Sequence, residues 1–384
     1  MNSVAVIGCG YVGLITGTVL ACKHADKDFI FLDTNEDKIK ALKEGKHYIV
    51  EPMFAGYYDI ARNKKLTTEY SDIVNADVII VAVNTPDDNG KCNLSFLYST
   101  IESINKYAKQ GAIVVIKSTV EVGTTKMLAE TRFRKDLHVV NIPEFLVEGE
   151  AIVNMLNPSR VIIGYSKNKD SFVFSKLRAL FYYVKDDKIV ETDSNTSELS
   201  KLASNFMLAQ RVASINAIES LAEEKNADIM DISKILRMDP RIGGLYLSPS
   251  AGFGGSCFRK DINNISNICK DRTFSKFFMN VNDINNYHML KIVEKIGTNK
   301  RVLFLGYTFK ESSNDTRDSP TKFIIDCLPK SVQYDVYDFR IEQYDKPPSG
   351  DYDVVILMLN EPAYIQIAEQ FPRENVIDTK YVLC

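Results

Sequence analysis

The sequence predicts an α/β protein in which two α/β domains are joined by a long helical bridge. From residue 1 to about residue 190, short apolar runs rich in β-branched residues alternate with helical patterns, and this alternation starts again near residue 298. Between them, the stretch from Asn195 to about Asn226 has no glycine or proline and carries apolar residues at helical spacing. A chain of 384 residues is too long for one ordinary core. We therefore expect domains at residues 1–194, 195–297 and 298–384.

The strands expected in the first domain are short runs that are apolar on both faces. They are Val4–Ile7, Phe29–Leu32, Val78–Val83, Ile113–Lys117, His138–Ile142 and Arg160–Gly164. Such runs, alternating with amphipathic helices, predict a parallel sheet covered on both sides. The first domain is therefore expected to be of Rossmann type.

The later elements follow from the same patterns. A glycine-rich loop at 240–256 follows the predicted long helix. Two more helical patterns come after this loop and extend to about Gly297. The last domain is predicted to contain strands at Arg301–Gly306, Tyr334–Asp338 and Asp353–Leu359 and helices at Thr321–Leu328 and Ala363–Gln370. We expect a second, Rossmann-like α/β domain there.

Composition narrows the possible partners and compartment. A net charge of −3 and the lack of a long basic run argue against a nucleic-acid or anionic-membrane partner. The seven cysteines are scattered and form no Cys-x-x-Cys pair, which favours reduced thiols over disulfides or a zinc site. No leader segment and no membrane-spanning run are apparent. We expect a cytoplasmic protein without a metal.

A dinucleotide-binding motif follows the first predicted strand. Gly8, Gly10 and Gly13 form G-x-G-x-x-G between a strand and a helix, which is the context this motif requires. The glycines allow a tight turn, close approach of a pyrophosphate and close helix–strand packing. Asp33 ends the second strand, where a carboxylate accepts hydrogen bonds from ribose hydroxyls and repels a 2′-phosphate. The motif therefore predicts NAD rather than NADP.

Polar residues follow several other predicted strands. Thr85 and Thr119 end two of them and are expected on the nicotinamide side, because ligands bind beyond the carboxyl ends of parallel strands. Glu144 and Glu148 follow a third strand and would share a face if that segment were helical. These positions predict a reacting site at this edge of the sheet.

Two further groups of residues carry possible chemistry. Lys201 and Asn205 are four residues apart in the long helix and can polarise a reacting oxygen. Cys257 follows the flexible pair Gly254–Gly255 and precedes Lys260 and Asp261. A nearby ammonium favours thiolate over thiol, so this cysteine is a candidate nucleophile.

Taken in order, these motifs resemble those of the nucleotide-sugar 6-dehydrogenases, and the resemblance covers nearly the whole chain. The motifs are Gly8–Gly13, Asn84–Pro86, Lys117–Thr119, Pro143–Leu146, Lys201–Asn205, Asp239–Gly243, Phe253–Cys257, Phe309–Lys310 and Asp315–Arg317. The resemblance implies a four-electron oxidation of UDP-glucose to UDP-glucuronate with two NAD reduced in succession. It also implies that Cys257 adds to the intermediate aldehyde and carries it through a thiohemiacetal to a thioester, which water cleaves.

The resemblance also implies roles for individual residues. Lys201 and Asn205 would stabilise the oxyanion at C6, and Asp261 would hold or activate water with help from Thr119. Glu148 would be the acid/base for thioester hydrolysis, with Glu144 as its companion. The implied cofactor contacts are Gly8, Gly10, Tyr11, Val12, Gly13, Asp33, Lys38, Thr85, Thr119, Glu148, Lys260 and Arg317. The implied substrate contacts are Glu144, Phe145, Leu146, Glu148, Lys201, Asn205, Arg241, Tyr246, Phe253, Gly254, Cys257, Phe309 and Lys310.

In such enzymes the arginine at the position of Arg241 serves the neighbouring subunit's sugar site, so the resemblance implies a homodimer built on the long helix.

One residue departs from the pattern: Arg259 stands where many relatives have proline, which would stiffen the turn by fixing φ. Three alternatives stay open. They are the same chemistry on GDP-mannose or a UDP-N-acetylhexosamine, a two-electron β-hydroxyacid dehydrogenase, and a non-catalytic nucleotide-sugar-binding protein.

Overall fold

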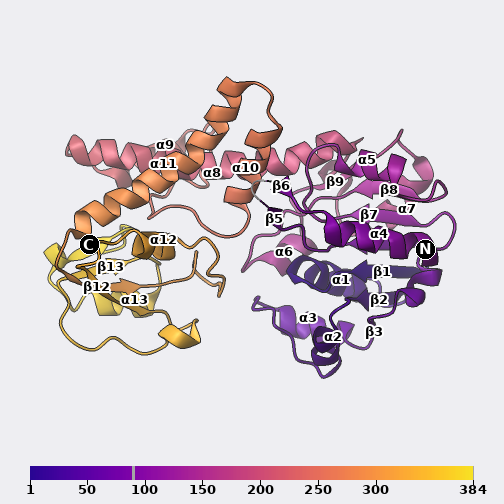
Figure 1. The fold of residues 1–384 in the computed structure, drawn as a ribbon, viewed down its shortest axis with the longest axis horizontal. Helices are drawn as coiled ribbons and strands as arrows, with labels where there is room; N and C mark the ends of the chain where they lie inside the picture. The colour runs from indigo at the N-terminus through magenta and orange to yellow at the C-terminus, as the bar shows by residue number, and fades with distance from the viewer. Residues whose placement is uncertain (89–90, 384) are drawn as a thin grey trace. The chain divides into compact units, whose positions relative to one another are not determined.

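The computed structural model describes residues 1–88 and 91–383 (Figure 1). They form two compact units, one from Met1 to Leu202 and one from Ala203 to the end of the chain. The boundary falls within a single long helix, α8 (Ser194–Glu224). Each unit has its own hydrophobic core and its own parallel sheet. The finer division at residues 1–194, 195–297 and 298–384 stays a prediction.

The first unit is built on an eight-stranded sheet with the strand order β10-β9-β8-β7-β4-β1-β2-β3. The strands are β1 (Ser3–Ile7), β2 (Asp28–Leu32), β3 (Lys65–Thr67), β4 (Val78–Val81), β7 (Ile113–Ile116), β8 (His138–Asn141), β9 (Val161–Tyr165) and β10 (Ile189–Asp193). A separate hairpin pairs β5 (Asp87–Asp88) with β6 (Lys91–Cys92).

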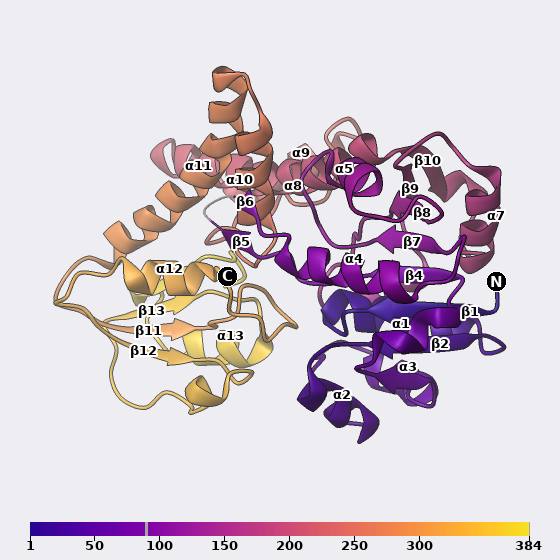
Figure 2. The ribbon, with the colours of Figure 1, turned by 45° about the vertical axis from the view of Figure 1, so that its right-hand side comes forward.

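The helices of the first unit cover both faces of this sheet (Figures 1 and 2). They are α1 (Tyr11–Lys23), α2 (Glu36–Lys43), α3 (Phe54–Ala61), α4 (Ser95–Tyr107), α5 (Thr124–Thr131), α6 (Ala151–Leu156) and α7 (Ser171–Leu180), with 3₁₀ turns η1 (Tyr70–Asn75) and η2 (Asp186–Lys188). Side chains alternate along each strand: Val4 and Val6 pack with α1, α3, α6 and α7, whereas Ala5 and Ile7 pack with α4 and α5. This two-sided burial explains why the strands are continuous apolar runs.

The sheet differs from the fully parallel arrangement that the sequence predicts. β9 pairs antiparallel to β8, with Val140 opposite Tyr165 and Asn141 opposite Gly164, and β10 then runs parallel to β9. A parallel neighbour needs a crossover that returns to the other edge of the sheet. The six-residue helix α6 spans only about 9 Å, so the chain turns back into β9 from the edge where β8 ends.

The second unit combines helices with a four-stranded parallel sheet of order β12-β11-β13-β14. Its helices after α8 are α9 (Ile229–Met238), α10 (Phe258–Ile268), α11 (Arg272–Ile296), α12 (Pro320–Asp326) and α13 (Pro362–Ala368), with 3₁₀ turns η3 (Glu342–Tyr344) and η4 (Arg373–Asn375). The strands are β11 (Arg301–Leu305), β12 (Gln333–Tyr337), β13 (Val354–Leu357) and β14 (Val376–Asp378).

The predicted α/β class with two sheets and a long helical bridge is confirmed (Figure 1). Helix α9, strands β3, β10 and β14 and the paired strands β5 and β6 add to the predicted elements. Among the described residues, no helix is both long and apolar enough to cross a membrane.

Candidate active site

The glycine-rich loop has the geometry that a dinucleotide requires. Gly8 has φ of +95°, and a Cβ on it would lie 2.5 Å from the Ala82 carbonyl oxygen. A Cβ on Gly13 would lie 1.8 Å from the Gly8 carbonyl oxygen, so both positions exclude any side chain. Gly10, just before α1, would meet nothing within 4 Å. The loop is therefore tightly packed at Gly8 and Gly13 and open at Gly10, where the helix N-terminus can accept a pyrophosphate.

Asp33 lies beside this loop at the end of β2. Its Oδ2 accepts hydrogen bonds from the Cys9 backbone N–H at 2.9 Å and from Lys38 Nζ at 2.9 Å. Its Oδ1 accepts the Asn35 N–H at 3.0 Å. The predicted cofactor residues Asp33 and Lys38 thus lie together against the glycine loop, in an arrangement that fits the adenosine ribose of NAD.

The two threonines predicted at strand ends also lie together. β4 and β7 are neighbours in the sheet, and Thr85 Oγ1 donates to the Thr119 carbonyl oxygen at 2.7 Å. Ser118 Oγ donates to the Val83 carbonyl oxygen at 2.7 Å, which ties the same two loops. These contacts place both threonines at the carboxyl edge of the sheet, as predicted.

Glu144 is part of a buried charged cluster. Its Oε1 accepts a hydrogen bond from Lys201 Nζ at 2.9 Å, and its Oε2 accepts the Leu146 N–H at 2.7 Å. Burial favours the neutral acid, but the Lys201 charge and hydrogen bond hold the pKa of Glu144 below its usual value. Lys117 belongs to the same cluster: burial lowers its pKa to about 8, with Glu144 opposing the shift and Lys201 adding to it.

Glu144 and Glu148 do not share a helical turn, so the arrangement considered from their spacing is wrong. Residues 142–147 have no regular structure, and a turn begins only at Glu148. The Glu144 carboxylate binds the N–H two residues ahead, a local bond that competes with helix formation. Gly149 has φ of +86°, which also breaks a helical continuation.

The first turns of α8 fix the position of Lys201. Ser197 Oγ bonds Asn141 Oδ1 at 2.7 Å, and a Cβ on Gly164 would lie 2.4 Å from Ser197 Cβ. Glu198 accepts the N–H groups of Gly123 at 2.6 Å and Thr125 at 2.8 Å, at the start of α5. The helix is thereby held on the carboxyl edge of the sheet, and its next turn brings Lys201 to Glu144.

One turn further along α8, Asn205 contacts the segment that carries the cysteine. Asn205 Nδ2 donates to Asp261 Oδ2 at 2.6 Å, and both side chains are buried. Asp261 lies in the first turn of α10, and its N–H donates to the Cys257 carbonyl oxygen at 2.9 Å. Cys257 is the exposed N-cap residue of this helix. A helix N-terminus stabilises negative charge, which favours the thiolate.

The diglycine lets the cysteine loop pack closely on the 309–320 region. A Cβ on Gly254 would lie 2.4 Å from the Asp318 carbonyl oxygen, and one on Gly255 would lie 3.0 Å from the Phe309 ring. The Gly255 N–H donates to the Arg317 carbonyl oxygen at 3.0 Å. Phe309 and Arg317, predicted from separate motifs, therefore lie next to the loop that leads to Cys257.

Arg259, the departure from the family pattern, has partners in two other helices. Its Nη2 donates to Asn286 Oδ1 on α11 at 2.7 Å. Its guanidinium lies 5.7 Å from the centre of the Phe323 ring on α12. Arginine thus supplies through side-chain contacts a restraint that proline would supply through its ring.

The structure also shows residues that the sequence patterns did not single out. Asn285 on α11 bonds both backbone groups of Phe253, with Oδ1 accepting its N–H at 2.8 Å and Nδ2 donating to its carbonyl at 3.1 Å. The Arg160 guanidinium stacks 3.7 Å from the centre of the Phe145 ring. Glu51 bonds the Tyr11 hydroxyl at 2.6 Å. Each pairs residues far apart in sequence, and no local spacing signals such a contact.

Two predicted arginines form exposed pairs with nearby aspartates. Arg241 bonds Asp239, with Nη2 at 2.6 Å from Oδ2, and Arg317 bonds Asp315, with Nε at 2.9 Å from Oδ1. Among the other predicted substrate residues, Tyr246 has φ of +60°, and Lys310 Nζ lies 5.9 Å from the centre of the Phe309 ring.

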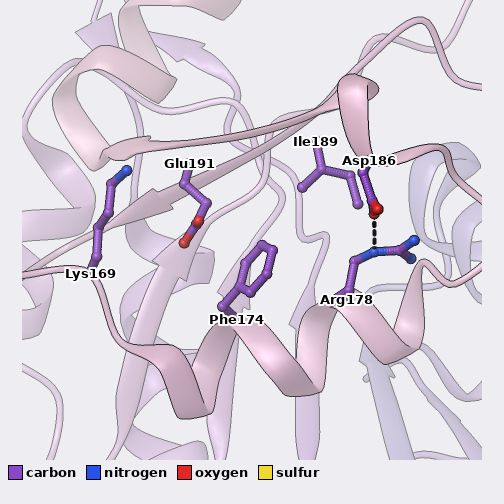
Figure 3. Close-up of a pocket in the computed structure, with 6 residues that line it drawn as sticks. All are labelled: Lys169, Phe174, Arg178, Asp186, Ile189 and Glu191. Atoms are coloured by element: carbon purple, nitrogen blue, oxygen red, sulfur yellow. Dashed lines mark hydrogen bonds and ion pairs between the residues drawn. The ribbon is translucent and has the colours of Figure 1, made fainter.

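A surface hollow of about 480 Å³ in the first unit has none of the predicted site residues in its lining (Figure 3). It is lined by Lys169, Phe174, Arg178, Asp186, Ile189 and Glu191. Figure 3 shows Arg178 paired with Asp186 at one end, at 2.7 Å. Across residues 1–88 and 91–383, no group of three or more His, Cys, Asp or Glu side chains is placed to hold a metal ion.

Comparison with known families agrees with this arrangement. The NAD-binding domain model of the UDP-glucose/GDP-mannose dehydrogenase family matches residues 2–185, and the central domain model of that family matches residues 195–287. The chain belongs to the UDP-glucose/GDP-mannose dehydrogenase family. The predicted family, the NAD-binding domain and the dehydrogenase class are thereby confirmed.

Individual relatives match over most of the chain. A UDP-glucose 6-dehydrogenase of Drosophila melanogaster is 33% identical over 88% of this chain and 77% of its own length. One from Arabidopsis thaliana is 33% identical over 89% of this chain and 77% of its own length. A solved UDP-glucose dehydrogenase of the archaeon Pyrobaculum islandicum superposes with a TM-score of 0.85 at 25% identity, covering 100% of this chain and 95% of that one.

Proposed function

We propose that this protein oxidises the C6 alcohol of UDP-glucose to the carboxylate of UDP-glucuronate, consuming two NAD and one water. The observation that carries the proposal is the chain of contacts around α8. Lys201 and Asn205 lie one turn apart on this helix, and Asn205 bonds Asp261, whose own N–H bonds the backbone of Cys257. Asn205, a proposed oxyanion donor, is thus linked through Asp261 to the backbone of Cys257, the proposed nucleophile.

NAD, when bound, accepts hydride from the reacting carbon in each oxidation. The residues that would hold it are the open Gly10 with the start of α1 for the pyrophosphate and Asp33 for the adenosine ribose. Thr85 and Thr119 lie on the nicotinamide side, and Lys260 and Arg317 are proposed contacts from the second unit. Gly8 and Gly13 have no room for side chains, so they keep the loop in the form that a dinucleotide needs.

The first oxidation turns the alcohol into an aldehyde. Lys201 and Asn205 would donate hydrogen bonds to the oxygen on C6 as negative charge develops there. The Glu144 carboxylate holds Lys201 in place by accepting a hydrogen bond from its Nζ.

The second oxidation uses Cys257. Its sulfur adds to the aldehyde carbon, the carbonyl oxygen takes a proton, and the product is a thiohemiacetal bound to the enzyme. Loss of a second hydride and the hydroxyl proton gives a thioester. Because the aldehyde stays covalently attached, it is not released between the two oxidations.

Hydrolysis of the thioester completes the cycle. Asp261 with Thr119 would position the attacking water, and Glu148 would take its proton as the general base. Water adds to the thioester carbon, the C–S bond breaks, and the Cys257 thiolate is regenerated with the carboxylate product.

The sugar nucleotide is proposed to bind through the segments that flank these groups. Phe145 and Leu146, the loop from Tyr246 to Gly254, and Phe309 with Lys310 would line its site. Lys310 supplies a point charge for the diphosphate. The contact of the Arg160 guanidinium with the Phe145 ring would restrain Phe145 in this site.

We also propose a cytoplasmic homodimer built on α8 and its neighbours. Large apolar side chains there are more than half exposed in the isolated chain: Met207, Leu221, Ile235, Met238 and Leu245. Exposed apolar groups at this density are typical of a protein–protein interface. Arg241, 88% exposed, lies between Met238 and Leu245 in this region and is proposed to reach the partner's sugar.

An NADH assay on a panel of sugar nucleotides tests the proposed function. The proposal predicts two NADH per UDP-glucose and a glucuronate product, with weaker turnover of GDP-mannose and UDP-N-acetylhexosamines. Preference for one of those nucleotides would favour the first alternative, and one NADH per substrate would favour a two-electron dehydrogenase. Binding without NADH would identify a non-catalytic protein.

A further inference from the structure

Glu51 is a nearly buried carboxylate, 9% exposed, in the irregular segment that precedes α3. Three donors converge on it. Its Oε2 accepts the Tyr11 hydroxyl at 2.6 Å and the Gly149 N–H at 2.8 Å, and its Oε1 accepts the Ala151 N–H at 2.6 Å. These three donors come from two segments that lie on opposite sides of Glu51 in the sequence, one before it at Tyr11 and one after it at Gly149 and Ala151.

Both segments belong to the proposed active site. Tyr11 is the first residue of α1, directly after Gly10 in the cofactor loop. Gly149 lies in the turn at residues 148–150 that begins with Glu148, and Ala151 is the first residue of α6. Glu51 therefore joins the loop that would hold the pyrophosphate to the turn that carries the proposed acid/base.

The neighbouring residue Tyr48 adds a second tie to the same loop. Its hydroxyl donates to the Cys9 carbonyl oxygen, and Lys38 Nζ lies 5.8 Å from the centre of its ring. Segment 48–51 thus crosses the cofactor loop and is bonded to it on both sides of Gly10.

The charges near Tyr11 are consistent with a close arrangement of Glu51 and Glu148. Burial raises the pKa of Tyr11, and the hydrogen bond and charge of Glu51 and the charge of Glu148 raise it further. The Tyr11 hydroxyl therefore remains a proton donor to Glu51, and the Glu148 carboxylate lies near enough to act on it.

A buried carboxylate is stable only while its donors are in place. Hydrogen bonds to a charged acceptor are stronger than neutral ones, and an uncompensated buried charge is strongly unfavourable. If the Glu148 turn moved away from the cofactor loop, Glu51 would lose the hydrogen bonds from the Gly149 and Ala151 N–H groups or the one from Tyr11. The Glu51 carboxylate consequently keeps the Glu148 turn at a fixed distance from the cofactor loop.

We infer that Glu51 is a positioning residue that fixes the Glu148 turn against the cofactor loop. The inference rests on the proposed function, because it gives Glu148 its role. Glu51 touches neither substrate nor cofactor in this assignment. It acts through Glu148, by setting where that carboxylate lies relative to the bound nicotinamide and the thioester.

The test is Glu51→Gln in the full-length enzyme, with Glu44→Gln as the matched control. Glutamine keeps the shape but replaces one acceptor oxygen with an NH₂ group that faces donors. We expect kcat for NADH formation to fall about tenfold, from loss of charge-assisted bonds. The affinity for UDP-glucose, measured by calorimetry, should stay within twofold of wild type, as should both parameters in Glu44→Gln.

A double variant separates positioning from general destabilisation. In the Glu148→Gln background, Glu51→Gln should reduce kcat by less than twofold further, because its effect passes through Glu148. Independent, multiplying effects would overturn the inference, and so would a Glu51→Gln enzyme as active as Glu44→Gln. If Glu51→Gln does not fold, Glu51→Asp, which keeps the charge but shortens the side chain that reaches the three donors, replaces it in the same cycle with the same criteria. Failure of wild type to form NADH would instead refute the proposed function.

Discussion

Asn205 on α8 donates a 2.6 Å hydrogen bond to Asp261 on α10, the helix that Cys257 caps. Both side chains are buried, so the bond is shielded from water and its geometry is restrained by two helices. It joins the element that carries the proposed oxyanion donors to the element that carries the proposed nucleophile. Loss of either partner should therefore disturb the groups proposed to carry out catalysis.

Asn205→Ala tests this link. The variant loses a donor to the developing oxyanion and the hydrogen bond that Asn205 gives to Asp261. We expect kcat to fall about 10²-fold, the usual cost of removing one such donor. Asn195→Ala, an exposed asparagine on the same helix, should keep wild-type kcat in the same assay. A less than threefold loss in Asn205→Ala would contradict the assigned role.

Asp33→Ala tests the cofactor site. The carboxylate bonds the Cys9 N–H and Lys38 and is proposed to bind the adenosine ribose, so its loss should raise KM for NAD about tenfold or more. The ratio of KM values for NADP and NAD should also fall, because a repelling charge is removed. Asp37→Ala, an exposed neighbour in α2, serves as the control. Unchanged cofactor dependence in Asp33→Ala would mean that the ribose binds elsewhere.

Lys117 should leave a signature in the pH dependence of stability. Burial lowers its folded-state pKa to about 8 from the ordinary 10.5, so between these values the unfolded chain binds more protons than the folded one. Stability should therefore rise with pH across that window, by about 3 kcal/mol. Urea unfolding at several pH values measures this. The rise should be absent in Lys117→Met and retained in Lys300→Met, an exposed control; identical slopes would refute the assignment.

The contacts of Arg259 predict a measurable coupling. Arg259→Ala removes the bond to Asn286 and the contact with Phe323, so thermal stability should decrease. In a double-mutant cycle with Asn286→Ala, the two losses should be non-additive by about 1 kcal/mol. Thermal unfolding of the four proteins gives the coupling. Strict additivity would show that the arginine does not restrain the turn through α11.

A structural feature can be predicted from the sequence where the residues of one local segment determine it. Gly8, Gly13 and Asp33 follow from a spacing within two consecutive strands and a helix. The close packing predicted at Gly8 and Gly13 is present, and Asp33 lies against the same loop. The apolar strands follow from burial on both faces of the sheet. The Lys201–Glu144 pair joins two motifs that were each visible in the sequence, although their contact was not.

Other features depend on contacts between distant segments. The direction of β9 depends on the short α6 connection, and the non-helical state of the Glu144–Glu148 segment depends on bonds to Leu146 and Lys201. Glu51 and Asn285 are ordinary polar residues in the sequence. Their importance appears only where folding brings Tyr11 to Gly149 and α11 to Phe253.

The central claim is that Cys257 carries the substrate through the second oxidation. The most direct test is single-turnover NADH formation by Cys257→Ser with UDP-glucose and excess NAD, compared with wild type. Serine keeps the shape and the helix cap but is a far weaker nucleophile at neutral pH. We expect two NADH per substrate for wild type and one for the variant, with unchanged NAD affinity. Two NADH from Cys257→Ser at the wild-type rate would contradict it.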